Sequence, residues 1–204
     1  MFKKIASDAL GLSDIGKIIK REDFDKTLSD DYVLHEDGEK IHFLIKSKTD
    51  EYCFTNRALI HLDGEKAASS KRNLYRYEYY QNPISNVSIE TAGTIDLDLE
   101  IKFTLGGKPV SVDIDKKEGE AIADLYKSLL AISHSQEEGK RKFESAEKSL
   151  SFAKDLIHSN RFHDNDISNE FKETTNFAYD WLNEHYQSNT KKDFGDIFDR
   201  YIQN

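Results

Sequence analysis

The sequence IDLDLEIKFTLGGKPVSVDI, residues 95–114, decides the fold class. Its first half alternates apolar and polar side chains, which gives an extended strand one dry face and one solvated face. The Gly106-Gly107 pair then supplies a hairpin turn, and a second alternation follows it. The stretch therefore predicts two antiparallel strands that pack one face on a core. Their apolar positions are Ile95, Leu97, Leu99, Ile101, Phe103, Val110, Val112 and Ile114.

The same strand signals, separated by turn dipeptides such as Asp63-Gly64 and Asn82-Pro83, extend from about residue 32 to residue 115. They predict seven short strands. No helix-length segment separates them, so parallel strands with helical crossovers are disfavoured and a closed antiparallel meander is favoured. After the strands, apolar residues recur at the spacing of one amphipathic helix. We expect this helix to cap an open end of the barrel that the closed meander forms. Its apolar positions are Ile122, Leu125, Tyr126, Leu129 and Leu130.

Helical patterns lie on both sides of the strands. Residues 2–19 carry apolar side chains at three- and four-residue steps and predict an N-terminal helix, which Gly11 and Gly16 weaken. From about residue 135 to 204, two further stripes joined by a polar loop predict an antiparallel helical hairpin, followed by a short last helix. Several large apolar residues fall outside these stripes, and a two-helix hairpin cannot bury them alone. They are Phe152, Phe162, Phe177 and Tyr179.

Composition limits the classes of function. The 204 residues carry a net charge of −9, with 37% hydrophobic and 33% charged residues. This acidic balance argues against a module that binds nucleic acid by neutralising phosphates. A single cysteine, Cys53, excludes an intrachain disulfide or a cysteine zinc cluster, and no apolar run is long enough to span a membrane. We therefore expect a cytoplasmic protein.

Three motifs resemble the bacterial pleckstrin-homology-like (PH-like) domain family in their order and spacing. They are the stretch from Phe54-Thr55-Asn56-Arg57 to Ile60, the segment Pro83-Ile84-Ser85, and the block from Glu90 to Ile101 that contains Gly93, Asp96, Asp98 and Glu100. The resemblance covers roughly residues 30–132. The C-terminal part is similar to the helical extension of YvbH-like proteins.

The resemblance implies an α+β fold. Seven antiparallel strands would form two orthogonal sheets, closed at one end by a C-terminal helix, which agrees with the period analysis. It also implies a tendency to form ring-like or larger homo-oligomers, and it implies no settled function. The predicted organisation is an N-terminal helix and linker at 1–29, a PH-like domain at 30–133 and a helical extension at 134–204.

Two charged clusters are candidate sites. The carboxylates of Asp96, Asp98 and Glu100 share one face of a strand, so they could hold a cation or act as an acid and base, although a solvated face paired with basic residues is favoured. The other cluster consists of basic residues that could contact an anionic ligand. Its members are Lys46, Lys48, Lys71, Arg72 and Arg76.

No catalytic motif, cofactor loop or metal-ligand spacing is found, so no catalytic, cofactor-binding or metal residue is predicted. The sequence favours a non-enzymatic binding and assembly module that forms homo-oligomers and contacts proteins, with an unidentified partner recruited through the helical extension as a further possibility. The alternative is a peripheral membrane or anionic-ligand module, because Lys3, Lys4, Lys17 and Lys20 flank the apolar stripe of the N-terminal helix.

Overall fold

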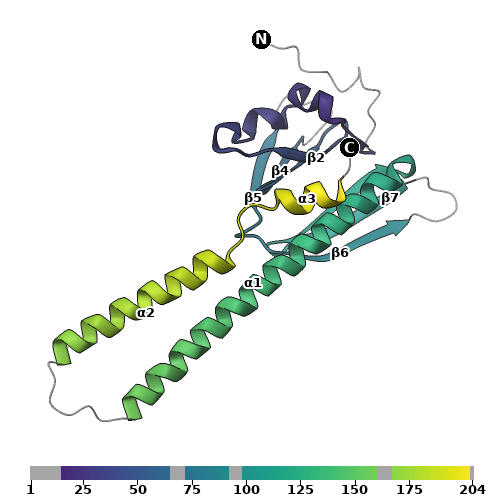
Figure 1. Cartoon of the computed structure of the whole chain (residues 1–204). Helices are drawn as coiled ribbons and strands as arrows, with labels where there is room; N and C mark the ends of the chain where they lie inside the picture. Colours follow the sequence, from purple (N-terminus) through teal and green to yellow (C-terminus); the bar gives the residue numbers. More distant parts are fainter. Residues whose placement is uncertain (1–14, 65–71, 92–97, 160–166, 203–204) are drawn as a thin grey trace. The chain divides into compact units, whose positions relative to one another are not determined.

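The computed structural model describes residues 15–64, 72–91, 98–159 and 167–202 of the chain (Figure 1). By their contacts the residues divide into two compact units, which we describe separately. Residues 1–133 and 192–204 form the first, here called the β unit, and residues 134–191 form the second, here called the helical unit.

The described strands of the β unit form two antiparallel sheets, one of five strands and one of three, each in sequential order. The five-stranded sheet contains β1 (Lys17–Ile18), β2 (Ile41–Lys46), β3 (Glu51–Thr55), β4 (Ala58–Asp63) and β5 (Asn73–Glu78). The three-stranded sheet contains β6 (Ile84–Thr91), β7 (Asp98–Leu105) and β8 (Lys108–Asp115).

Short 3-10 helices and three α-helices complete the described chain. The 3-10 helices are η2 (Arg21–Lys26), η3 (Ser29–Tyr32), η4 (His35–Asp37) and η5 (Lys116–Glu118). The α-helices are α1 (Gly119–Ser159), α2 (Ile167–Asn189) and α3 (Gly195–Tyr201). Within the described residues, no helix combines the length and hydrophobicity needed to cross a membrane.

The prediction of an N-terminal helix is wrong for the part of residues 2–19 that the structure describes. Residues 2–14 of the predicted helix lie outside the described residues, but Lys17–Ile18 form a strand that pairs with β2. Gly16 pairs with Ile114 of β8 and so links the two sheets. A side chain there could not fit, because a Cβ on Gly16 would lie 2.6 Å from Cγ2 of Ile45. The glycine that weakens a helix is thus needed for a close backbone approach.

The antiparallel prediction is confirmed, but the strand count of seven is wrong. The described residues contain eight strands, because β1 precedes the region that was expected to be extended. The alternation in β7 is confirmed: Leu99, Ile101 and Phe103 are buried between more exposed neighbours. Ile95 and Leu97 lie outside the described residues.

The central strands β2, β3 and β4 of the five-stranded sheet are buried on both faces. The outer face of this sheet holds a small cluster in which Leu44, Cys53 and Ile60 pack against Ile19 and Val33 of the preceding segment. The polar residues His42 and Lys46 of β2 are buried as well. The segment between β1 and β2, residues 19–40, acts as a third layer that covers these strands.

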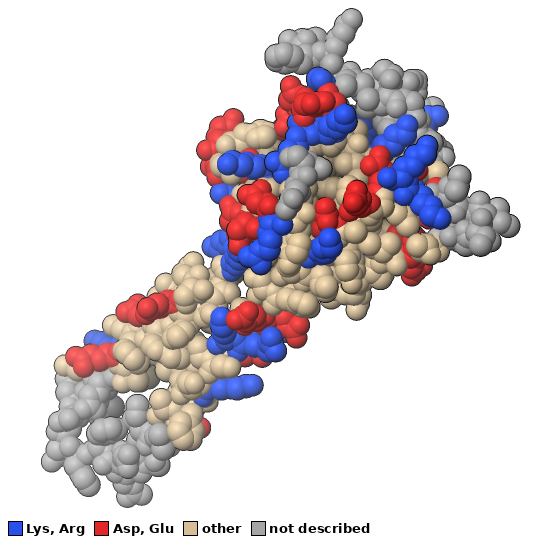
Figure 2. Space-filling model, turned by 45° about the vertical axis from the view of Figure 1, so that its right-hand side comes forward, with Lys and Arg blue, Asp and Glu red and all other residues tan. Residues whose placement is uncertain are grey.

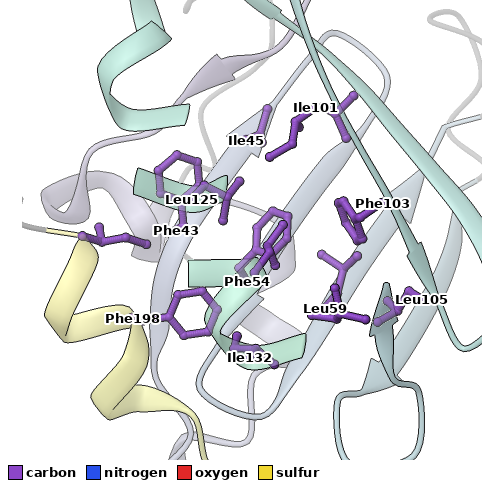
Figure 3. Packing of buried hydrophobic residues seen from close by; sticks show 14 of the residues in the cluster. Phe43, Ile45, Phe54, Leu59, Ile101, Phe103, Leu105, Leu125, Ile132 and Phe198 are labelled. Carbon is purple, nitrogen blue, oxygen red and sulfur yellow. The ribbon is translucent and has the colours of Figure 1, made fainter. Parts of the chain in front are cut away.

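The main core lies between the inner faces of the two sheets and includes residues of α1 and α3 (Figure 3). Phe54 packs there with ring centroids 6.3 Å from Phe43 and 6.2 Å from Phe103. The first half of α1 contributes four fully buried side chains, as expected for the capping helix, and α3 contributes more from the end of the chain. These residues are Ile122, Leu125, Leu129, Ile132, Phe194 and Phe198.

Candidate functional site

The predicted basic residues are not gathered in one site. Lys46, at the end of β2, is buried and forms an ion pair with the buried carboxylate of Glu51. Glu51 also accepts a hydrogen bond from the backbone N–H of Ser29, at 2.8 Å. Burial alone would raise the pKa of Glu51, but Lys46 and the Ser29 hydrogen bonds hold it below its ordinary value. Glu51 of β3 thus ties the segment between β1 and β2, through Ser29, to Lys46 of β2.

Arg76 of β5 is also engaged within the fold. Its Nη2 donates to the buried carboxylate of Glu39 at 3.0 Å, and its Nε donates to Glu78 at 2.7 Å. The hydroxyl of Thr55 donates to Glu39 as well, and so does the backbone N–H of Leu34, at 2.8 Å. Burial raises the pKa of Glu39, but the hydrogen bonds from Arg76 and Thr55 lower it below its ordinary value.

Lys48 and Arg72 remain at the surface. Lys48 is exposed in the turn between β2 and β3, and Arg72 donates a hydrogen bond to the carbonyl of Thr49 in the same turn. Asp50 lies beside them and accepts from Thr49 and from His61. Lys71 lies outside the described residues. The structure therefore brings two of the five predicted residues to one exposed turn, next to a carboxylate.

The described carboxylates of β7 are held by neighbouring polar groups. Lys102 binds Glu100 at 2.8 Å and Glu90 of β6 at 2.7 Å, and Ser111 of β8 also donates to Glu100. These contacts raise the pKa of Lys102 to about 12. Asp98 begins the strand, whereas Asp96 lies outside the described residues. Across the described chain, no three His, Cys, Asp or Glu side chains are grouped as they would be to hold a metal ion.

The family-motif turn is a structural junction. Phe54 is buried in the core, and Asn56 accepts from the backbone N–H of Lys40 at 2.8 Å. The amide nitrogen of Asn56 donates to Asp193 at 2.6 Å, just before α3, and the Asn56 carbonyl accepts from the N–H of Phe194 at 2.7 Å. The turn therefore anchors α3 on the β unit.

The other motif residues that the structure describes also bind the backbone or lie at the surface. Arg57 donates to the carbonyl of Asp37 at 2.6 Å, and the carbonyl of Pro83 accepts from the N–H of Gly106 at 3.0 Å. Glu90 is exposed and binds Lys102. Gly93 lies outside the described residues.

The face of the β unit seen in Figure 2 carries interspersed acidic and basic side chains and no continuous basic area. The helical unit shows wider uncharged areas on the same view. Its α1 and α2 segments run antiparallel, and the rings of Phe143 and Tyr186 meet edge to face with centroids 5.7 Å apart. A Cβ on Gly139 would lie 2.2 Å from the carbonyl oxygen of Asn189, so the helices are in close contact there.

Large aromatic side chains cover the outside of the helical unit. The side chains of Phe152 and Phe177 are 66% and 65% exposed, and that of Tyr179 is 70% exposed. The sequence prediction that a two-helix hairpin cannot bury these residues is confirmed. Phe162 lies outside the described residues, whereas Phe171, at 71% exposure, was expected in the facing stripe. Exposed apolar area of this kind commonly marks a protein interface.

This fold is that of a PH-like domain followed by a helical hairpin, and the chain belongs to the bacterial PH domain family. The family model for the bacterial PH domain matches residues 9–133. A second model, the YvbH-like oligomerisation region, matches residues 144–204, which include the exposed aromatic residues of the helical unit.

Three relatives illustrate the similarity. The uncharacterized protein YvbH of Bacillus subtilis (strain 168) is 55% identical over 204 residues, which cover all of both chains. The uncharacterized protein YjqA of the same organism is 34% identical over 97 residues, which cover 47% of this chain and 76% of YjqA. The crystal structure of a PH domain containing protein from Exiguobacterium sibiricum 255-15 matches with a TM-score of 0.84 and 53% identity, over 93% of this chain and 100% of that one.

Proposed function

We propose that this protein is a non-catalytic assembly module that forms homo-oligomers through its helical unit. The observation that carries the proposal is the exposure of Phe152, Phe171, Phe177 and Tyr179 inside the segment that matches an oligomerisation region. Burying one exposed phenylalanine contributes roughly 1.5–3 kcal/mol, so a few such residues on each copy can drive association. The PH-like domain at 30–133 is then the part that the extension at 134–204 brings together in several copies.

Most of the charged candidate residues are engaged in contacts within the fold. Lys46 and Arg76 bind the buried carboxylates Glu51 and Glu39, and Glu100 binds Lys102. These contacts stabilise the β unit and connect its layers. The same contacts give Lys46, Arg76 and Glu100 a structural role. From the sequence, these residues were candidates for ligand binding.

Light scattering of the full chain at micromolar concentration tests this function. We expect a mass that is a multiple of the 23.5 kDa of one copy. A single monomer peak over the whole concentration range would count against the proposal.

A second candidate is an anionic ligand or membrane headgroup at the turn that carries Lys48 and Arg72. The favouring observation is that the hydrogen bond from Arg72 to Thr49 places both basic residues at one exposed turn. Flotation with anionic liposomes at low salt, where attraction is least screened, tests it. Loss of flotation in Lys48→Glu would support this candidate, and no flotation of the wild type would exclude it.

A further inference from the structure

His42 of β2 lies against the C-terminal helix α3. The pairing of β2 with β3 shifts its register between Ile41 and Phe43, so His42 is the extra residue of a β-bulge. A bulge of this kind re-aims a side chain out of the regular alternation of its strand. The His42 side chain is 7% exposed, and its ring stacks on that of Phe198 with centroids 5.2 Å apart and an angle of 17° between the ring planes. A strand of the sheet thus presents a titratable ring to the apolar side of a helix.

The docking of α3 on the β unit depends on few other contacts. The helix has seven residues, and a helix this short is not stable by itself in water. Asn56 holds the start of the helix through the two hydrogen bonds described above, and Ile197 and Phe198 are buried against the β unit. Because the helix forms only when it is docked, a change at the His42 ring alters the stability of α3 as a whole.

The His42 ring has little room and little access to solvent. A Cβ on Gly195 would lie 3.4 Å from Nε2 of His42, so the backbone at the start of α3 comes close to that edge of the ring. Nδ1 of His42 lies 3.3 Å from Oδ1 of Asp199, whose side chain is 66% exposed. Solvent weakens an ion pair with so exposed a partner. A positive charge on the ring would therefore lose its hydration and gain only a screened counter-ion.

The elements around His42 bring four charged groups towards it. Asp199 in α3 and Asp193 just before α3 are acidic, whereas Arg21 of η2 and Lys40 just before β2 are basic. Burial is the largest influence on the pKa of His42 and lowers it, the two basic groups lower it further, and the two carboxylates raise it. The pKa of the docked ring is therefore below its ordinary value, and the neutral ring is the form that fits against α3.

We infer that His42 is a proton-sensitive latch for α3: its neutral ring holds the helix on the β unit, and protonation of the ring releases the helix. The chain passes between the two units twice, at residues 133–134 and at residues 191–192, and α3 anchors the second passage on the β unit. Release of α3 leaves the helical unit anchored through α1 alone. The latch controls the attachment of the helical unit, so it goes beyond the proposed homo-oligomer and does not depend on it.

Protonation of His42 is linked to the detachment of α3. In the detached state the ring is exposed and has its ordinary pKa of about 6.5. The contribution of His42 to docking is complete above that pH and is lost as the pH falls through the lower pKa of the docked ring. For one proton and an ordinary pKa of about 6.5, the docking constant falls at most about tenfold between about pH 7.5 and about pH 5.5.

Hydrogen exchange of the full-length protein at these two pH values, corrected for the intrinsic exchange rate at each pH, tests the latch. The reporters are the backbone N–H groups of Ile197, Phe198 and Ile202, which bond to carbonyls of Phe194 and Phe198. We expect these groups to be less protected than β7 and to lose protection several-fold at the lower pH, with about tenfold as the upper limit. Equal protection of α3 and β7 at both pH values would overturn the inference, because α3 would then open only with the whole β unit.

A pair of histidine variants assigns the effect to one residue. His42→Gln should remove the pH dependence of α3 protection, because glutamine does not titrate in this range. His61→Gln is the matched control and should retain it: His61 lies in the same sheet beside a carboxylate, 3.4 Å from Asp50, but its ring stacks on Tyr52 and not on α3. A pH dependence that persists in His42→Gln would overturn the inference.

Titration of the wild-type protein by nuclear magnetic resonance of its imidazole groups tests the latch without relying on His42→Gln to fold. The His42 ring should titrate below its ordinary pKa of about 6.5, and Asp199→Asn should lower its pKa further because the nearest carboxylate is removed. A pKa of His42 at or above 6.5 would mean that the protonated ring is bound to Asp199 in the docked state, and it would overturn the inference.

Discussion

The C-terminal helix α3 should be an integral part of the β unit, and Phe198→Ala tests this. Phe198 is fully buried, with its ring centroid 5.2 Å from that of His42 and 6.3 Å from that of Tyr79. Removal of a buried phenylalanine side chain typically costs about 3–5 kcal/mol. Because α3 has only seven residues, it can also detach locally, which limits the loss. We therefore expect the free energy of unfolding to fall by about 3 kcal/mol.

Urea unfolding followed by far-ultraviolet circular dichroism measures this loss. Fluorescence of Trp181, the single tryptophan, reports on the helical unit in the same samples. Tyr32→Ala is the control, since Tyr32 is an aromatic residue of the β unit that is 47% exposed, and its loss should cost less than about 1 kcal/mol. If Phe198→Ala costs no more than the control, α3 does not belong to the core and this account of the β unit is refuted.

Three further changes probe the polar contacts and the close approach of the sheets. Burial lowers the pKa of His42, so stability should decline as pH falls below about 6.5, the ordinary histidine value, and His42→Gln should remove that step in thermal unfolding while the exposed His134→Gln retains it. Glu39→Ala should cost about 3 kcal/mol in urea unfolding because it leaves Arg76 without its buried partner, and a loss below about 1 kcal/mol would contradict the role of this pair. Gly16→Val should cost about 1–3 kcal/mol, and a neutral result in thermal unfolding would contradict the tight contact between the sheets.

Local patterns in the sequence predicted the parts of the fold that depend on one element. The alternation of Leu99, Ile101 and Phe103 belongs to a single strand whose other face is more exposed, so a period of two is visible. In β2 the same reasoning fails, because a covering segment buries Leu44 on the second face as well. The covering residues Ile19 and Val33 lie well before Leu44 in the sequence, so a short window of residues around β2 does not include them.

Prediction of the candidate sites failed for the same reason, because their contacts join residues that are far apart in the sequence. Lys46 binds Glu51 in the next strand, but the Ser29 N–H that completes the contact comes from a separate segment. Arg76 and Glu39 are also far apart in the chain. The helical hairpin, by contrast, carries more large aromatic residues than its two helices can bury. This excess is visible in the sequence of the hairpin by itself. The exposure of Phe152 and Phe177 was therefore predictable.

Native mass spectrometry of the protein isolated from its own cells tests the central claim most directly, because it reports stoichiometry and bound molecules together. The account predicts a mass that is an integer multiple of 23.5 kDa, and it predicts that Phe177→Glu lowers this multiple. A mass of one chain at every concentration, or a complex that contains one copy of this chain and a different protein, would contradict assembly of this protein with itself.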